Sequence, residues 1–291
     1  MECNQAIKKD NYQVFGYLSN YLNQAPDFIK KEDIDELVEV GVPEEYAFRT
    51  ILASAFGLDI VDDQTDKLLF HNYFNQMIHQ LKVNDYMINP YYQKINIPSL
   101  KIGQSELKYE KYQAYEGFVF NDIIQEANGR QIPQVGFFST EFEFPAILEN
   151  GRIWMTITPN EIETMKEPVD RAFGNVLTFG LGLGYYPFMV SEKDNVEQVT
   201  IVESNQDVID LFNTYILPQF TYRDKVNIIK ADAFEYAETQ LAKQNYDYIF
   251  TDLWHDVSDG IDLYLKMKQH EKHSPKSIFS YWIEKSILCY L

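Results

Sequence analysis

Apolar residues recur at helical spacing through the first third of the chain. Val14, Leu18 and Tyr21 share one helix face, and Gly41 and Pro43 stand where helices commonly end and begin. Further stripes comprise Phe48, Ile51, Leu52 and Ala55, and then Phe70, Phe74, Met77, Ile78 and Leu81. We therefore expect an α-helical N-terminal domain over residues 1–130, with these stripes in its core.

The helical pattern weakens after residue 83, where tyrosines are scattered among polar residues. One tetrapeptide there, Asn89-Pro90-Tyr91-Tyr92, resembles the Asn-Pro-Pro-Tyr signature of amino-directed DNA methyltransferases, which grips a target amine. No strand-like apolar run precedes it, and Asn-Pro commonly starts a turn. We interpret the tetrapeptide as a turn.

A β-hairpin and a capped helix are expected over residues 131–172. Asn150-Gly151 separates the apolar stretches FPAILE and RIWMTIT, and Asn-Gly is a strong signal for a two-residue hairpin turn. Thr158, followed three residues later by Glu161, forms a capping box that begins a helix.

From residue 173 to residue 291, short apolar runs alternate with helical segments. The runs are Val176 to Phe179, Val199 to Val202, Val226 to Ile229, Tyr248 to Thr251 and Ile278 to Ile283. Strands that alternate with helices indicate a parallel sheet covered on both faces, with ligands bound beyond the carboxyl ends of the strands. The sequence therefore predicts an α/β domain with a Rossmann-like, doubly wound, mostly parallel sheet.

The first of these strands runs into a turn in which Gly180, Gly182 and Gly184 alternate with leucines. A P-loop would end in Gly-Lys-Ser/Thr, whereas this turn ends in Gly-Tyr-Tyr. A dinucleotide turn would carry a glycine where Tyr185 stands, so that match is partial. An S-adenosylmethionine turn uses Gly-x-Gly-x-Gly, because the backbone passes close beneath the ligand without a Cβ. This last match is complete.

An acidic residue follows each of the next three strands. Glu203 ends the second strand, where a carboxylate can accept both ribose hydroxyl protons. Asp232 ends the third, where it can accept from the adenine amine, and Asp252 ends the fourth, beside the place of a reacting group. Three acids at one sheet edge favour an S-adenosyl ligand over a dinucleotide.

Charge and composition narrow the choice of partner. The 291 residues include 25 basic and 44 acidic side chains, which gives a formal net charge of −19. Because so acidic a chain repels phosphate backbones and has no dense Lys/Arg run, nucleic acid is disfavoured. A small molecule, a cationic molecule or a protein is the expected partner.

The remaining composition indicates a cytoplasmic protein without membrane association. The first residues lack the apolar core of a signal peptide, and no window approaches a membrane-spanning run. Cys3 and Cys289 have neither metal-binding nor redox spacing, and His270 and His273 lack the zinc protease spacing. We therefore expect two ordinary thiols and no metal.

The segment from about Asn175 to Asp256 resembles the core of a class I S-adenosylmethionine-dependent methyltransferase. The preceding hairpin and capped helix resemble the entry to the spermidine-synthase-like branch of that superfamily. The resemblance implies a seven-stranded sheet with S-adenosyl-L-methionine as the cofactor. It also places the glycine turn beneath the methionine moiety, Glu203 on the ribose, and Asp232 with the backbone amide of Ala233 on the adenine.

Some positions depart from this resemblance. Thr178 stands where methyltransferases often carry an acid, and Leu183 and His255 stand where spermidine synthases usually carry aspartates. After the fifth apolar run only EKSILCYL remains, too little for the antiparallel hairpin that closes the usual sheet. We therefore favour methyl over aminopropyl transfer, and we expect the N-terminal region or a homodimer to cover the open edge.

The predicted function is methyl transfer to a small-molecule or protein acceptor. An aminopropyltransferase and a catalytically silent S-adenosylmethionine-binding protein are the alternatives. Asp252 is the first candidate to bind or deprotonate the acceptor, and His255 and Asp256 are the second choices. Further candidates for the acceptor pocket, each also readable as a packing or surface residue, are Tyr185, Tyr186, Trp254, Tyr281, Trp282 and Glu284.

Overall fold

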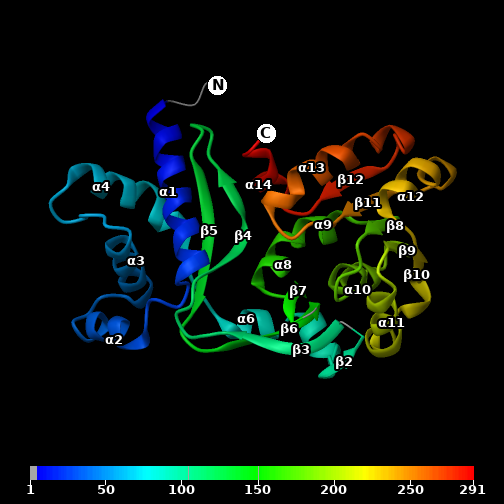
Figure 1. Cartoon of the computed structure of the whole chain (residues 1–291), viewed down its shortest axis with the longest axis horizontal. Helices are drawn as coiled ribbons and strands as arrows, with labels where there is room; N and C mark the ends of the chain where they lie inside the picture. Colours follow the sequence, from blue (N-terminus) through cyan, green and yellow to red (C-terminus); the bar gives the residue numbers. More distant parts are fainter. Residues whose placement is uncertain (1–4, 104, 150) are drawn as a thin grey trace. The chain divides into compact units, whose positions relative to one another are not determined.

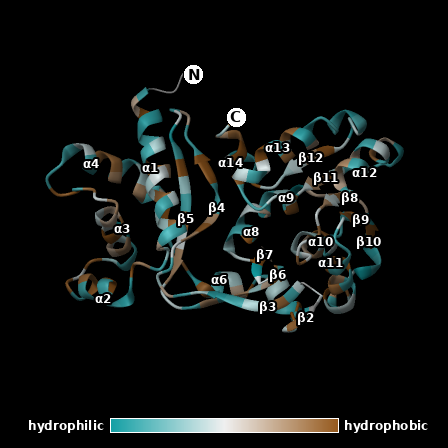
Figure 2. Cartoon of the chain, in the orientation of Figure 1, coloured by the Kyte–Doolittle hydropathy of each residue, from teal (hydrophilic) through white to brown (hydrophobic). Residues whose placement is uncertain are grey.

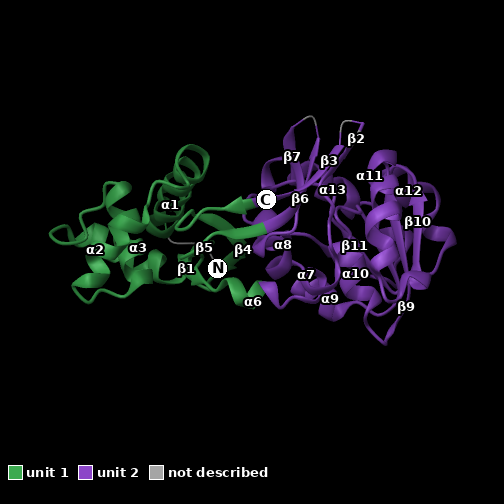
Figure 3. Ribbon diagram, turned by 90° about the horizontal axis from the view of Figure 1, so that it is seen from below, with its two compact units in different colours: residues 1–86, 111–143 green, residues 87–110, 144–291 purple. Residues whose placement is uncertain are grey.

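The computed structural model of the chain describes residues 5–103, 105–149 and 151–291, so Cys3 and Asn150 lie outside the described residues. The chain forms two compact units, which are described separately here. Unit 1 comprises Met1–Tyr86 and Lys111–Glu143, and unit 2 comprises Met87–Glu110 and Phe144–Leu291 (Figure 3).

The N-terminal part of unit 1 is helical, as its periodicity predicts. Its helices are α1 (Gln5–Gln24), α2 (Lys31–Glu39), α3 (Glu44–Ala55), α4 (Gln64–Leu69), the π-helical η1 (Phe70–Phe74) and α5 (Asn75–Met77). Hydrophobic and hydrophilic residues alternate along α1 (Figure 2), and Val14, Leu18 and Tyr21 are buried. Phe48 of α3 stacks on Phe137 with ring centroids 4.0 Å apart, so the predicted stripes contribute to a core, although Ala55 of the second stripe is exposed.

The helical domain expected over residues 1–130 is helical as far as Met77, but β-strands occur from Ile78 onward. There unit 1 contains a three-stranded sheet in the order β1-β5-β4. Its strands are β1 (Ile78–Leu81), β4 (Phe118–Gln125) and β5 (Gln131–Phe138). Ile78 and Leu81 continue a helical stripe in sequence, but they pair in parallel with Val135 and Phe138. Because that partner strand is remote in sequence, local periodicity does not reveal the pairing.

A second, four-stranded sheet has the order β2-β3-β6-β7. Its strands are β2 (Leu100–Ile102), β3 (Ser105–Tyr112), β6 (Phe142–Glu149) and β7 (Arg152–Thr156). The predicted hairpin is confirmed, because β6 and β7 pair antiparallel with Glu149 opposite Arg152. Two short helices, α6 (Val83–Met87) and α7 (Pro90–Lys94), precede this sheet in sequence.

The predicted start of the capped helix after the hairpin is confirmed, but the structure divides the helix into two segments. The backbone N–H of Thr158 donates to Glu161 over 2.7 Å, which completes the capping box. The helix consists of α8 (Pro159–Thr164) and α9 (Lys166–Arg171). Pro168 has no N–H to donate to the carbonyl of Thr164, which accounts for the division between the two.

The predicted parallel sheet is confirmed with five strands in the described residues, in the order β10-β9-β8-β11-β12 (Figure 1). They are β8 (Gly174–Phe179), β9 (Val196–Glu203), β10 (Val226–Lys230), β11 (Tyr248–Thr251) and β12 (Ile278–Tyr281), and all pair in parallel. The resemblance implied seven strands, so this sheet is shorter than expected. Successive strands are added in one direction from β8 to β10 and in the other direction from β11 to β12, so the switch point lies between β8 and β11, the place where such folds bind ligands.

Helices cover both faces of this sheet, as the doubly wound expectation requires. The α-helices of this region are α10 (Tyr185–Ser191), α11 (Gln206–Leu211), α12 (Ala233–Thr239), α13 (Val257–Lys268) and α14 (Glu284–Leu288), which follows the last strand. Other short helical segments are η2 (Phe212–Ile216), η3 (Leu217–Gln219), η4 (Arg223–Lys225), η5 (Leu241–Lys243) and η6 (Glu271–His273). In Figure 1, α10 and α11 lie on one side of the sheet, and α12 and α13 lie on the other.

Packing alone requires two of the three glycines that follow β8. A Cβ on Gly180, where φ is +97°, would overlap the backbone carbonyl oxygen of Asp252. A Cβ on Gly184, where φ is +75°, would overlap the ring of Phe212. The turn therefore approaches both the chain after β11 and the helical segment after α11 at distances that only glycine permits.

Gly180→Ala is expected to lower the free energy of unfolding by about 2–4 kcal/mol, because the new Cβ meets a fixed backbone atom and φ is positive. Gly57→Ala is the matched control: φ there is +76°, but no heavy atom lies within 4 Å of the added Cβ. The control is expected to lose only about 1 kcal/mol. Urea denaturation of both variants measures the difference, and equal losses would contradict the close approach at Gly180.

Candidate functional site

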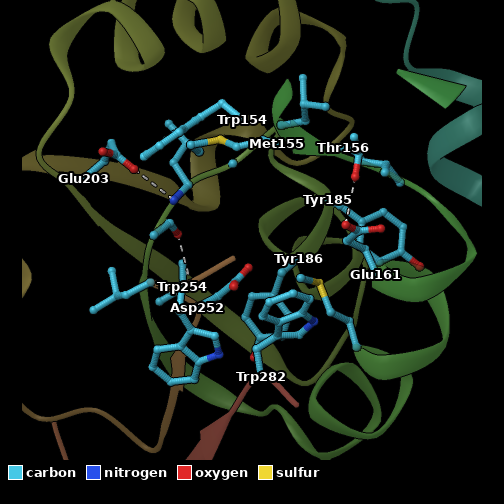
Figure 4. A pocket seen from close by; sticks show the side chains of 18 of the residues that line it. Trp154, Met155, Thr156, Glu161, Tyr185, Tyr186, Glu203, Asp252, Trp254 and Trp282 are labelled. Carbon is cyan, nitrogen blue, oxygen red and sulfur yellow. Dashed lines mark hydrogen bonds between the residues drawn. The ribbon is translucent and has the colours of Figure 1, made fainter. Parts of the chain in front are cut away.

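A pocket of about 500 Å³ lies in unit 2, beyond the carboxyl ends of β8, β9 and β11 (Figure 4). Five of the predicted site residues line it: Gly180, Gly182, Glu203, Asp252 and His255. Three others do not, namely Gly184, Asp232 and Ala233. The glycine-turn and ribose candidates and the two catalytic candidates thus border one cavity. The two residues expected to contact adenine, Asp232 and Ala233, lie outside its lining.

Gly182 is the glycine of the turn that borders open space. Its φ is +56°, and the nearest atom to an added Cβ would be the sulfur of Met155, 3.9 Å away. Unlike its two neighbours, Gly182 is explained by its positive φ and not by a close packing contact. The open space beside its Cα leaves room for a ligand to approach the backbone.

Glu203 is fixed at the end of β9 by two backbone groups. Its Oε2 accepts from the N–H of Leu181 over 3.2 Å, and its Oε1 accepts from the N–H of Asn205 over 2.7 Å. The residue is 8% exposed. Each carboxylate oxygen has a further lone pair, so the oriented group can still accept two hydroxyl protons, as a ribose would offer.

Asp232 acts as the N-cap of α12. Its Oδ1 accepts from the N–H groups of Phe234 and Glu235, each over 2.9 Å. Ala233 is buried at the first position of that helix. The adenine contacts expected of Asp232 and Ala233 stay predictions, because neither residue borders the pocket as the structure has it.

Asp252 lies at the switch point of the sheet with its carboxylate toward the centre of the side chains drawn in Figure 4. Its backbone N–H donates to the carbonyl of Phe179 over 2.9 Å, which fixes the residue beside the glycine turn. No hydrogen bond from a described residue reaches its carboxylate. Burial, together with the negative charge of Glu161, raises the pKa of Asp252 to about 8.

Glu161 also lines the pocket, and the sequence did not reveal it as a site residue. Its carboxylate accepts from the hydroxyl of Thr156 over 2.9 Å and from the backbone N–H of Thr158. Burial raises the pKa of Glu161 in spite of these hydrogen bonds, which act in the opposite direction. A capping box has the same sequence pattern whether or not the start of its helix borders a cavity. The sequence therefore carries no signal that Glu161 lines the pocket.

Aromatic side chains form much of the wall. The chain has three tryptophans, and all of them, Trp154, Trp254 and Trp282, line the pocket. Trp282 is held by a 2.8 Å hydrogen bond from its Nε1 to the hydroxyl of Thr164, and Ile283 after it has a φ of +45°. Such a φ is strained for a β-branched residue, and it occurs directly beside the pocket.

The tyrosine candidates divide between the pocket and its surroundings. Tyr185 and Tyr186, at the start of α10, line the pocket as expected. Tyr281 lies outside the pocket lining, and its hydroxyl donates to Glu271 over 3.0 Å. Glu284 likewise accepts from the hydroxyl of Tyr264 over 2.7 Å and lies outside the lining.

His255 lies at the rim of the pocket. Its side chain is 47% exposed, and its Nδ1 lies 3.0 Å from a carboxylate oxygen of Asp259. Its ring also packs edge-on against Trp154, with centroids 4.3 Å apart. These two contacts hold the His255 ring at the mouth of the cavity.

The charge of the lining is one-sided. Three carboxylates, those of Glu161, Glu203 and Asp252, border the cavity. Among the described residues that line it there is no lysine and no arginine. Carboxylates in a partly enclosed, aromatic-walled space produce a negative potential, and tryptophan faces attract cations. A ligand that carries positive charge would favour the ionised forms of Asp252 and Glu161, whose pKa values are raised in the structure.

Neither a metal cluster nor a membrane-spanning helix occurs in the part of the chain that the structure describes. His270 and His273 follow α13 in sequence, with ring centroids 5.5 Å apart, and they belong to no group of three potential metal ligands in the described residues.

Comparison with known proteins supports the resemblance seen in the sequence. Residues 167–271 match the family model of the spermine/spermidine synthase domain, which confirms the spermidine-synthase-like resemblance of this segment. No curated protein matches the chain.

Two solved structures illustrate the similarity. Spermidine synthase from Thermotoga maritima shares 19% identity over 48% of this chain and 53% of its own, with a TM-score of 0.34. A SAM-dependent methyltransferase from Agrobacterium tumefaciens shares 20% identity over 48% of this chain and 49% of its own, with a TM-score of 0.37. The chain thus spans about half the length of these structures.

Asp252→Asn is expected to stabilise the ligand-free protein at about pH 8. The folded pKa is raised to about 8, so between about pH 4 and that value the folded state retains a proton that the unfolded state has lost. The contribution of this carboxyl to stability is therefore present at low pH and lost as the pH rises through that window. The amide removes this loss, a gain on the order of 1–3 kcal/mol.

Urea denaturation of wild type and variant at about pH 5 and about pH 8 tests this expectation. Asp232→Asn is the control, because it alters a strand-end acid outside the pocket and asparagine preserves the N-cap. A variant of Asp252 that is less stable than wild type at the higher pH would refute the burial argument.

Proposed function

We propose that the chain transfers an aminopropyl group from decarboxylated S-adenosylmethionine to an amine acceptor. The observation that carries the proposal is the pocket lining, which has three carboxylates and, in its described residues, neither lysine nor arginine. The decarboxylated donor carries a sulfonium and an ammonium. S-adenosylmethionine carries an additional carboxylate, for which the lining offers no lysine or arginine partner. The charge balance therefore favours the decarboxylated donor.

The residues present fit such a donor. Glu203 offers two oriented oxygens to the ribose hydroxyls. Gly182 lets the ligand approach the backbone, and the tryptophans offer apolar faces to a cation. The match of residues 167–271 to the spermine/spermidine synthase domain supports the same donor class.

The sulfonium supplies a carbon that is already activated for displacement, so the protein has to position the acceptor and manage its proton. Asp252 in its ionised form would take one proton from the acceptor ammonium and leave a neutral amine. The amine nitrogen would then bond to the donor carbon as the carbon–sulfur bond breaks, and the electron pair of that bond would stay on sulfur as a neutral thioether. A base with a pKa near 8 suits proton removal from a bound amine.

Glu161 would complement Asp252 on the acceptor side. Both carboxylates border one cavity, and burial together with the negative charge of Glu161 raises the pKa of Asp252. An ammonium between the two carboxylates would offset both effects. Acceptor binding would thereby convert Asp252 to its ionised, basic form.

Methyl transfer, the function favoured by the sequence, is the second candidate. The specific observation in its favour is Leu183, a side chain 2% exposed within the glycine turn. An apolar residue there gives the amine of a decarboxylated donor no carboxylate partner within the turn.

Calorimetric titration with decarboxylated S-adenosylmethionine and with S-adenosylmethionine separates the two candidates. We expect the decarboxylated donor to bind at least about tenfold more tightly, which corresponds to about 1.4 kcal/mol. Incubation with mono- and diamines, followed by mass spectrometry, then identifies the group transferred. Binding of S-adenosylmethionine alone, with methylated products, would replace the proposal by methyl transfer.

Asp252→Asn is expected to lower kcat/KM by about 10²- to 10⁴-fold, because asparagine cannot accept the acceptor proton. In wild type, activity should rise with pH as the carboxyl ionises, with a midpoint near the pKa of about 8. The sign follows because the ionised form is the base. The variant should lose this rise, and Asp232→Asn should retain it; a full pH profile in the Asp252 variant would assign the proton transfer to another group.

A further inference from the structure

The segment Asn89–Tyr92, interpreted from sequence as a turn, is the start of helix α7 in unit 2. Asn89 is its N-cap, and its side-chain oxygen accepts from the N–H of Tyr91 over 2.9 Å. Pro90 occupies the first helical position, where its fixed φ suits the helix. None of these residues lines the pocket, so Asn89 is not placed to grip a target amine as in the DNA methyltransferase signature.

Three side chains of this segment donate hydrogen bonds to residues that do line the pocket. Their partners belong to two different walls. The Nδ2 of Asn89 donates to the hydroxyl of Tyr185 over 3.0 Å, the hydroxyl of Tyr91 to the carbonyl of Leu183 over 2.6 Å, and the hydroxyl of Tyr92 to the carbonyl of Ile157 over 2.6 Å. Leu183 belongs to the glycine turn, and Ile157 follows β7.

Helix geometry explains how adjacent residues reach separate walls. Consecutive residues of an α-helix project about 100° apart, so Tyr91 and Tyr92 point in different directions from one short helix. Lys94 at the end of α7 also forms a 2.8 Å ion pair with Glu192, which follows α10. The helix thus contacts the glycine turn through Tyr91 and the far end of α10 through Lys94.

The glycine turn needs such external support. Its alternating glycines give the turn wide conformational freedom. Within the turn, the N–H of Gly184 donates a backbone hydrogen bond to the carbonyl of Leu181 over 2.9 Å. Tyr91 is 1% exposed and packs edge-on against Phe188, with ring centroids 5.5 Å apart. From this buried position the hydroxyl of Tyr91 donates to the carbonyl of Leu183, which lies between Gly182 and Gly184 in the turn.

We infer that Asn89, Tyr91 and Tyr92 are positioning residues that hold the glycine turn and the end of β7 at the separation required by the nucleoside donor. The inference rests on the proposed function in one respect, that the ligand between these walls is an S-adenosyl compound. The three residues act through Tyr185, Leu183 and Ile157 and do not themselves touch the ligand.

Tyr91→Phe and Tyr92→Phe each remove one hydroxyl and keep the ring. In the ligand-free protein, backbone amides of the peptide covering residues 180–184 should exchange hydrogen about three- to tenfold faster in Tyr91→Phe, since one hydrogen bond to the turn is lost. Both variants should bind decarboxylated S-adenosylmethionine about three- to tenfold more weakly, with the KM of the amine acceptor unchanged.

Tyr73→Phe is the matched control. The hydroxyl of Tyr73 is buried in unit 1 and donates to Asn11 over 2.7 Å, so its removal costs a comparable hydrogen bond away from the pocket. This control should lose stability while the exchange of residues 180–184 and the donor affinity stay at wild-type values. Tyr92 is half-buried, so its variant retains the test if the Tyr91 variant folds poorly.

The outcomes separate the two ideas. Variants of Tyr91 and Tyr92 that lose stability like the control, with unchanged exchange in the turn and unchanged donor affinity, would overturn the positioning role. Faster exchange of the turn in Tyr91→Phe supports that role even if wild type binds no S-adenosyl ligand, a result that would overturn the proposed function alone.

Discussion

The close approach of the glycine turn to the chain after β11 is the constraint on which the site depends. Gly180 lies against the carbonyl of Asp252, and the N–H of Asp252 donates to the carbonyl of Phe179. The same turn is tied to β9, because the N–H of Leu181 donates to Glu203. These contacts fix the ends of three parallel strands relative to one another, so two carboxylates from distant parts of the sequence border one cavity.

This arrangement has an energetic cost that indicates function. Asp252 is held without a hydrogen bond from a described residue to its carboxylate, and Glu161 adds negative charge near it. Groups that serve only stability are normally paired or exposed. A carboxylate kept in this state at a sheet switch point is typical of a site whose partner arrives with the substrate. The strained Ile283 beside Trp282 belongs to the same pattern.

Most of the fold around the site followed from local patterns. The alternation of apolar runs and helices predicted the parallel sheet, Asn150-Gly151 predicted the hairpin, and the Thr158–Glu161 pair predicted the capped helix start. The prediction failed from Ile78 onward in unit 1, where a helical stripe continues as a strand. Strand pairing is a contact between distant segments, and β-propensity depends on that context more than helix propensity does.

The sequence by itself determined the glycine turn and the acids at the strand ends, from which the class of ligand was predicted, because these features depend on short-range spacing and on which residue follows a strand. Only the tertiary structure showed that Glu161 lines the pocket, that Asp232 does not, and that Tyr91 donates a hydrogen bond to the turn. It also showed a lining of one charge sign, which changed the favoured donor. Burial, electrostatic potential and hydrogen bonds between remote segments arise only when the chain is folded, so no local pattern encodes them.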